Sequence, residues 1–285
     1  MEGGPARAPP QEAAELSATI RIGCQGWTYP DWLDVFYPPG AKQEDLLPFY
    51  SQIFDTVELD NTFYKPPKPT IARSWARHTP DDFRFAAKAP RAITHDALLR
   101  NSAAEMAELA RALEPLGDKL GPVLVQMPGE FVRDTDNAEA LARFLREAPE
   151  ALDLAVEFRD PSWHVPPTLE VLREHGAAVA WTQWRDLPAW CEITAPFLYV
   201  RWLGTRADIS RYDRIQIDRG AELVTWVDRV RRAQDSVDEI YGYVNNHYAG
   251  HSPETVNDLK RQLGLPVVDP KDVWPQGELF GGAEA

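Results

Sequence analysis

The sequence is short of basic residues and cysteines and has no long apolar run, and each shortage excludes a class of protein. The chain has 30 Lys and Arg against 44 Asp and Glu, which gives a formal net charge of -14 at pH 7. A surface of this sign repels phosphate backbones beyond a Debye length of about 8 Å, so we expect no general affinity for nucleic acid. No stretch approaches the roughly 20 apolar residues of a membrane-spanning helix, so we expect no membrane partner.

Two cysteines, Cys24 and Cys191, are too few for a disulfide framework or a zinc site. Residues 1–18 lack the basic start and apolar stretch of a signal peptide, so a cytoplasmic location is expected. The chain also lacks the Gly-x-Ser-x-Gly turn of many hydrolases and a Gly-rich phosphate-binding loop. No motif therefore indicates a cofactor, and we expect none.

The chain divides into one patterned region and two irregular ends. Residues 1–18 and 269–285 have no periodic pattern, so we expect a disordered N-terminal tail and a flexible C-terminal tail. Between them, residues 19–268 alternate β-rich runs with stretches of helical periodicity. The β-rich runs cover 19–27, 56–64, 83–90, 121–128, 152–159, 177–184, 197–204 and 239–247. The pattern is weakest after the sixth run, where it predicts a short helix at most.

Repeated alternation of strand and helix without a long linker predicts a single-domain α/β fold, namely a TIM-type (β/α)8 barrel. An open doubly wound sheet would produce a similar pattern. Two observations favour the closed barrel. No Gly-x-Gly-x-x-Gly fingerprint follows the first run, and polar residues occur at the end of nearly every run, as expected when all strand ends face one mouth.

Side-chain alternation along the strands indicates which residues face the barrel axis. With Val57 and Leu59 directed outward, Glu58 points inward, and the same parity turns Glu157 inward from the fifth run. Applied to the other runs, it adds polar residues that should converge at the mouth: Gln25, Asp60, Lys88, Gln126, Arg159, Arg201, Asn245 and His247. Because buried charges are costly unless paired, this set predicts either a ligand site or a self-contained network of ion pairs.

The mixture of charges indicates what the mouth could bind. Lys88, Arg159 and Arg201 would compete with a divalent metal for the neighbouring carboxylates. They are better suited to hold a carboxylate, phosphate or sulfate, the arginines through two hydrogen bonds each. The sequence therefore predicts a small anionic ligand and no metal.

Four residues are candidates for proton transfer. Glu58 and Glu157 are the expected acid or base groups. His95 and His247 could relay protons near neutral pH, although a single histidine is as often a structural hydrogen-bonding group. Trp27, just past the first run, could stack on a ligand or pack as an apolar lid over the mouth.

At these residues the chain resembles a known family. The segments IRIGCQGWTYPDW, FDTVELDNTFYKPP, FRFAAKAPRAITHD, LGPVLVQMP, LAVEFRDPSW, LYVRWLG and YGYVNNHYAGHSPETVNDLK are similar, in order and spacing, to the signature blocks of the YecE-like "domain of unknown function 72" family. The resemblance implies a TIM-type barrel and no established activity. The family's recurrent polar positions correspond here to Glu58, Asn61, Tyr64, Lys88, His95, Gln126, Glu157, Arg159, Arg201, Asn245, Asn246 and His247. Asn61, Tyr64 and Asn246 join the expected ligand-binding residues on this ground.

The chain departs from the family pattern in three places. The usual Gly-Thr-Ser-Gly-Trp opening is replaced by residues 23–27, and the usual His-Gly pair after the seventh strand is replaced by Leu203-Gly204. A customary Asp near the end of the sixth strand is replaced around Thr182-Gln183, unless Asp186 takes its place. If the missing His were a catalytic acid or base, this chain would be altered or inactive.

Three functions remain open from the sequence. The first is a metal-independent enzyme acting on a small polar anionic metabolite at the barrel mouth. The second is a divalent-metal phosphoesterase or nuclease built from Glu58, Asp60, Glu157 and His247. The third is a non-catalytic ligand-binding or scaffold protein. The sequence gives no indication of an oligomeric state.

Overall fold

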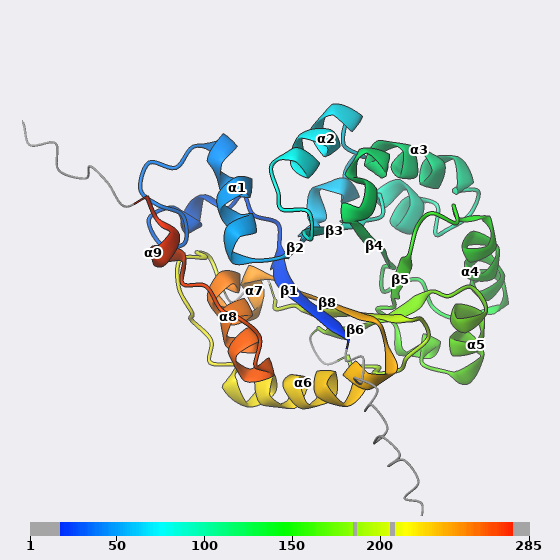
Figure 1. The fold of residues 1–285 in the computed structure, drawn as a ribbon. Coiled ribbons are helices and arrows are strands. Elements are labelled where there is room, and N and C mark those ends of the chain that lie inside the picture. Colours follow the sequence, from blue (N-terminus) through cyan, green and yellow to red (C-terminus); the bar gives the residue numbers. More distant parts are fainter. Residues whose placement is uncertain (1–17, 185–186, 206–208, 276–285) are drawn as a thin grey trace, which may run out of the picture.

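Eight parallel strands close into a barrel around a single axis (Figure 1). The structure is a computed structural model that describes residues 18–184, 187–205 and 209–275. The strands are β1 (Thr19–Gln25), β2 (Thr56–Leu59), β3 (Arg84–Lys88), β4 (Leu120–Gln126), β5 (Leu154–Glu157), β6 (Ala178–Gln183), β7 (Phe197–Trp202) and β8 (Glu239–Val244). Each strand pairs with its neighbours in sequence, and β8 pairs with β1 to close the ring. The predicted single-domain TIM-type barrel is confirmed.

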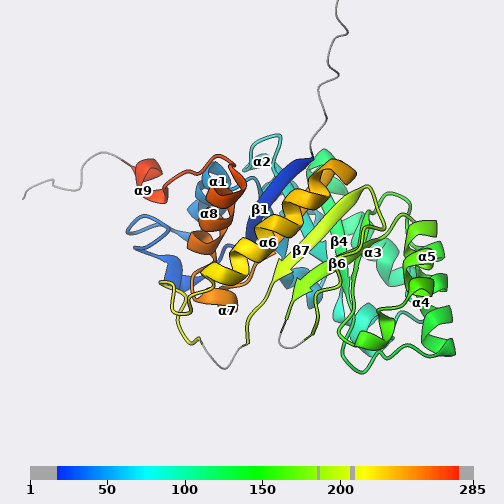
Figure 2. The ribbon, with the colours of Figure 1, turned by 90° about the horizontal axis from the view of Figure 1, so that it is seen from below.

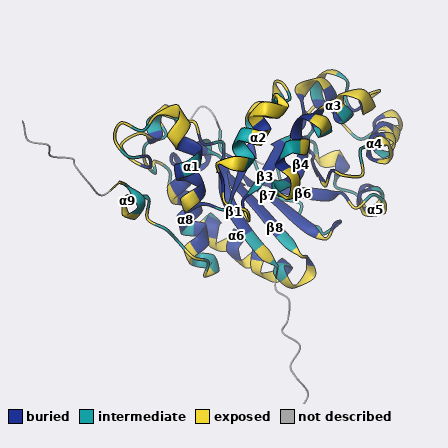
Figure 3. Cartoon of the chain, turned by 45° about the horizontal axis from the view of Figure 1, so that its top comes forward, coloured by how far each residue is buried: buried dark blue, intermediate teal, exposed yellow. Residues whose placement is uncertain are grey.

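The helices surround the barrel and expose their outer faces, whereas the strands are almost wholly buried (Figure 3). They are α1 (Gln43–Ile53), α2 (Pro69–Arg77), α3 (Ala103–Leu113), α4 (Thr135–Glu147), α5 (Pro166–Glu174), α6 (Gly220–Ala233), α7 (Asn246–Ala249), α8 (Ser252–Leu263) and α9 (Pro270–Val273). Local capping interactions determine where these helices begin and end. The side chain of Asp134 accepts a hydrogen bond from the backbone of Asn137 and caps α4, and Gly264 ends α8 in a left-handed conformation.

Alternate residues of β3 to β8 belong to two different apolar clusters. Val57, Leu59 and Val156 pack outward against the helices. Between them in the sequence, smaller and aromatic side chains such as Ala86, Ala155 and Tyr199 fill the inside of the barrel. This parity, which a pleated strand imposes, directs the polar residues at the strand ends toward the axis.

The described residues 187–196 contain no helix. They form an extended segment that packs against β6. The indole nitrogen of Trp181 donates to the carbonyl oxygen of Glu192 at 2.7 Å, and the hydroxyl of Thr194 accepts a hydrogen bond from the backbone of Val179 at 2.8 Å. Figure 2 shows β7 running beside α6. This is the part of the barrel in which the sequence pattern was weakest.

The ordered chain continues past residue 268, where the sequence analysis placed the start of a flexible tail. Asp269 caps α9, which packs against α1, and the indole nitrogen of Trp274 donates to the carbonyl oxygen of Phe36 at 3.1 Å. The rest of that expected tail, residues 276–285, and residues 1–17 lie outside the described residues. Across the part of the chain that the structure describes, every helix is too short or too polar to cross a membrane.

Candidate functional site

A cavity of about 280 Å³ lies at the carboxyl ends of the strands. Its size is at the low end of the range for small-molecule sites. The residues that line it are Gln25, Asp60, Lys88, Gln126, Arg159, Trp184, Arg201, Leu203, Gly204, Thr205, Asn245 and His247. The structure therefore brings together at one mouth eight of the ten residues that strand parity selects, from the ends of every strand except β6, which contributes Trp184.

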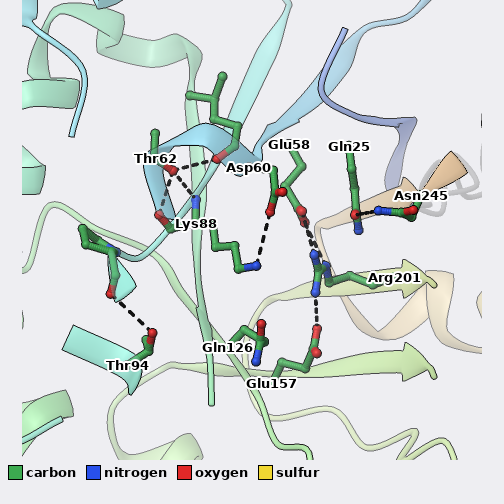
Figure 4. A network of polar contacts seen from close by, with 12 residues as sticks. Gln25, Glu58, Asp60, Thr62, Lys88, Thr94, Gln126, Glu157, Arg201 and Asn245 are labelled. Carbon is green, nitrogen blue, oxygen red and sulfur yellow. Dashed lines mark hydrogen bonds and ion pairs between the residues drawn. The ribbon is translucent and has the colours of Figure 1, made fainter. Parts of the chain in front are cut away.

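Arg201 on β7 forms the floor of this cavity and is bound by two carboxylates (Figure 4). Its Nε and Nη2 donate to the two oxygens of Glu58 on β2, at 3.0 and 2.8 Å. Its Nη1 donates to Glu157 on β5 at 2.6 Å. The hydroxyl of Tyr199 also donates to Glu58, at 2.7 Å. The side chains of Glu58 and Glu157 have no exposed surface, so both acids lie behind the arginine.

Two groups of this floor, Glu157 and Arg201, are held in their charged forms. Burial alone would raise the pKa of Glu157, but Arg159 and Arg201 outweigh it and lower the pKa to about 2. Burial likewise works against the charge of Arg201, but Glu58 and Glu157 together raise its pKa well above the usual value. Near neutral pH, Glu157 is an ionised partner for arginine and a poor proton donor. The acid or base role expected for Glu157 from the sequence stays a prediction.

Two further cations stand at the mouth, each beside an acid and an aromatic ring. The ammonium group of Lys88 donates to Asp60 at 3.2 Å and lies 4.4 Å from the centre of the Phe63 ring. The guanidinium of Arg159 lies 4.1 Å from the centre of the Trp184 ring, and its Nε donates to Glu157. Only about a tenth of the Lys88 and Arg159 side chains is exposed, at 12% and 10%. The pairing acids and rings hold both cations in place.

The opposite side of the mouth carries amide, hydroxyl and imidazole groups. Asn245 donates to the side-chain oxygen of Gln25 at 2.7 Å and accepts a hydrogen bond from the backbone of His247 at 2.8 Å. The Nε2 atom of His247 lies 3.0 Å from the hydroxyl of Tyr212. Tyr212 belongs to the loop after β7, outside any predicted strand, so strand parity could not identify it.

Gly204 packs β7 against the start of α7. A Cβ atom at this position would lie 1.5 Å from the carbonyl oxygen of His247 and 2.7 Å from the backbone nitrogen of Tyr248. No side chain larger than hydrogen fits here without moving one of the two segments. This contact places Thr205, which also lines the cavity, next to His247.

Two of the expected ligand-binding residues are buried elsewhere. The side-chain oxygen of Asn246 accepts hydrogen bonds from the indole of Trp32 and from the backbone and hydroxyl of Ser252, so Asn246 joins α7 to its neighbours. Trp27 is 8% exposed and makes an edge-to-face contact with Trp75 in the outer core. Trp27 therefore packs as an apolar side chain in the core and does not line the cavity.

Three other expected residues lie outside the cavity lining. Tyr64 is 76% exposed, and Asn61 is also exposed, both in the turn after β2. His95 lies in a π-helical turn (Ala92–Asp96), where its Nδ1 is 2.9 Å from the hydroxyl of Thr94 and its ring contacts Phe63 edge to face. Burial, with a smaller contribution from nearby cations, lowers the pKa of His95, so its ring is largely neutral at pH 7.

The donor set of the mouth does not suit a divalent metal. Over residues 18–184, 187–205 and 209–275, no three His, Cys, Asp or Glu side chains gather in a way that could hold a metal ion. The residues proposed for such a site include Glu58 and Glu157, whose oxygens are bound by arginines. A divalent cation would have to displace these charged hydrogen bonds.

Comparison with known proteins agrees with this architecture. A family model described as "Protein of unknown function DUF72" matches residues 21–278. A DUF72 family protein from Thermotoga maritima superimposes with a TM-score of 0.76 at 29% identity, over 86% of this chain and 99% of that one. A DUF72 family protein from Enterococcus faecalis shares the fold, with a TM-score of 0.72 at 20% identity over 91% and 99% of the two chains.

Two curated relatives are also similar in sequence. The UPF0759 protein YecE of Escherichia coli is 33% identical over 144 residues, which is 50% of each chain. The UPF0759 protein YunF of Bacillus subtilis is 32% identical over 168 residues, 57% of this chain and 58% of that one. The matched part thus spans little more than half the length of these relatives.

Proposed function

The chain belongs to the DUF72 family of proteins of unknown function, and from this premise we propose that it is an enzyme acting on a small polar anionic metabolite. The pocket at the barrel mouth is its site. Characterised TIM-barrel enzymes place their active sites at this end of the barrel, which supports the location.

One observation carries the proposal: the cavity presents cations to a ligand and keeps most of the balancing acids behind them. Lys88, Arg159 and Arg201 line the cavity. Glu58 and Glu157 are fully buried and do not line it. An entering anion would meet the positive groups at hydrogen-bonding distance and, apart from Asp60, the negative groups only at longer range, where the attraction of the nearer cations dominates.

The contacts indicate a different role for each of these residues in ligand binding or proton transfer. An ammonium group has three donors, of which Asp60 takes one from Lys88, and the guanidinium of Arg159 also lines the cavity. Lys88 and Arg159 would therefore hold the anion. Arg201, which the sequence analysis assigned to the ligand, already makes three hydrogen bonds to carboxylates and would chiefly fix the floor. His247 and Tyr212 are the proposed proton-transfer pair.

The binding step is tested by thermal unfolding with a panel of carboxylates and phosphates at constant ionic strength. A ligand at one hundred times its Kd stabilises the folded state by about 2.7 kcal/mol, which corresponds to a rise in Tm of roughly 5 °C or more for a domain of this size. Lys88→Met should abolish the rise. Lys271→Met, which removes an exposed charge from α9, is the matched control and should respond like the parent protein.

The result that overturns the proposal is a Tm that no anion raises, or an equal rise in the Lys88→Met variant. Neutral analogues of the same size, such as glycerol for glycerate, check that charge is required. Chloride at the same ionic strength checks that the rise is not a general salt effect.

A second candidate, binding without catalysis, is favoured by the state of the carboxylates. Glu157 has a pKa of about 2 and is bound by two arginines, and the position of the family's usual His is Leu203. Incubating the protein with each stabilising anion, followed by NMR of the anion, separates the two. Conversion that is lost in His247→Gln while the Tm rise persists supports an enzyme, and an unchanged anion supports a binding protein.

A further inference from the structure

The two sides of the mouth differ in chemistry, and from this difference we infer that the ligand is a small hydroxylated acid. Its anionic group would lie against the ends of β3 to β5 and its hydroxyl groups against the ends of β7, β8 and β1. This inference rests on the proposed function and specifies its substrate class.

The first side carries positive charge. Lys88 ends β3, Gln126 ends β4 and Arg159 follows β5, so the three lie on consecutive strands of the closed ring. Lys88 and Arg159 are each held by an acid and a ring, as described above. A carboxylate or phosphate placed between them could accept from both cations, since charge-assisted hydrogen bonds are stronger than neutral ones.

The second side carries hydrogen-bonding groups without charge. Gln25 ends β1, Asn245 follows β8, and Thr205 follows β7 beside His247. Figure 4 shows Lys88 on one side of Arg201 and Gln25 with Asn245 on the other. Amide and hydroxyl groups both donate and accept, which is the property needed to bind a hydroxyl group.

Two alternative ligand classes fit this arrangement less well. An apolar chain on the second side would bring no donor or acceptor to the amides of Gln25 and Asn245, and an amide atom that is buried without a partner costs about 1–3 kcal/mol. A second anionic group on that side would meet no permanent cation among the described lining residues of β7, β8 and β1 other than Arg201. Arg201 is itself held by Glu58 and Glu157.

The floor explains why the ligand must span the mouth rather than enter the barrel. Arg201 extends from β7 to carboxylates on β2 and β5, and Tyr199 lies next to Glu58 on the buried side. These groups leave the cavity shallow. Its volume of about 280 Å³ suits a compact polar molecule and not a long chain.

The inference is tested with matched probes whose binding is measured by titration calorimetry. The three-carbon set is glycerate, propionate and glycerol, and the six-carbon set is gluconate, hexanoate and sorbitol. We expect a hydroxylated acid to bind at least tenfold more tightly than the acid of equal length without hydroxyls, and the neutral polyol to bind least. A second set with phosphate as the anionic group, glycerol 3-phosphate against propyl phosphate, separates the two kinds of anion.

Substitutions on the two sides of the mouth test which side binds the anionic group and which binds the hydroxyl groups. Thr205→Val and Gln25→Met remove hydrogen-bonding groups at nearly constant volume, and should weaken only the hydroxylated acids. Lys88→Met should weaken hydroxylated and plain acids alike. Thr225→Val, on the exposed face of α6, is the matched control for Thr205→Val and should change neither.

The outcomes separate the two proposals. If plain acids bind as tightly as hydroxylated acids of the same length, the inference about hydroxyl groups is overturned and the anion site stands. If Thr205→Val and Gln25→Met weaken plain acids as much as hydroxylated ones, the assignment of the second side is overturned. If no acid of either set binds, both the inference and the proposed function are overturned.

Discussion

Arg201 and Glu58 face each other across the barrel, joined by two hydrogen bonds of 2.8 and 3.0 Å between side chains that start on β7 and β2. The pair is buried, with 3% of the Arg201 side chain and none of the Glu58 side chain exposed. The same guanidinium binds Glu157. One side chain thus connects three strands that are not neighbours in the sheet.

Removing this arginine should strongly destabilise the protein. In Arg201→Leu, Glu58 and Glu157 would remain buried without their main partner, and breaking a buried pair in this way costs about 3–5 kcal/mol. The free energy of unfolding, measured in urea, tests the expectation. Arg232→Leu, which breaks the exposed pair with Asp228, is the control and should cost no more than about 1 kcal/mol. Equal costs for the two variants would contradict the role of Arg201.

The stability conferred by Glu157 should depend on pH in a defined window. Its folded-state pKa, about 2, lies below its ordinary value of 4.5, so its contribution is complete above pH 4.5 and is lost as the pH falls toward 2. Urea unfolding of the parent protein and of Glu157→Gln at several pH values measures this. The difference between them should be large at pH 7 and shrink below pH 4.5. A difference that stays constant from pH 7 to pH 3 would show that Glu157 is not held ionised.

Adding one methyl group at Gly204 should disturb the mouth. In Gly204→Ala the new carbon would collide with the backbone of His247, so β7 and α7 would have to separate. We expect a loss of about 1–3 kcal/mol in stability, as for other overpacked sites. Gly129→Ala is the matched control, because a Cβ there would meet no atom within 4 Å. Thermal unfolding of both variants compares them, and an unchanged Tm in Gly204→Ala would refute the close approach.

Tyr212 should position the ring of His247. Tyr212→Phe removes the hydroxyl that lies 3.0 Å from Nε2 and should cost about 0.5–1.5 kcal/mol, while leaving the fold intact. The specific readout is the nitrogen NMR signal of the imidazole, which reports which ring nitrogen carries the proton. We expect the tautomer balance to change in Tyr212→Phe. If the imidazole signals are unchanged, Tyr212 does not position His247.

The fold and much of the mouth follow from the alternation of residues along the strands. Glu58, Lys88, Glu157 and Arg201 were placed inward because their neighbours are apolar, and a pleated strand sends adjacent side chains to opposite faces. The same rule could have identified Tyr199, two residues before Arg201, as a partner of Glu58. Pairing partners are harder to predict, since they depend on how far a side chain reaches across the barrel.

Residues beyond the strand ends could not be placed in this way. Asn245 and Asn246 are adjacent in the sequence, yet Asn245 faces the cavity and Asn246 bonds to Trp32 and Ser252. In a helical turn, neighbouring side chains point in different directions, and the two-residue period no longer applies. Tyr212 lies on a loop whose course depends on tertiary contacts, such as the hydrogen bond from its backbone to Asp31.

The layer formed by Arg201, Glu58 and Glu157 also limits how this protein could be redesigned. Shortening residues below the layer, such as Tyr199 or Tyr243, would open space that stays sealed from the entrance by three charged side chains. To accommodate a longer molecule, the pocket would therefore have to be extended away from the barrel interior. This requires changes in the loops after the strands and not in the side chains inside the barrel.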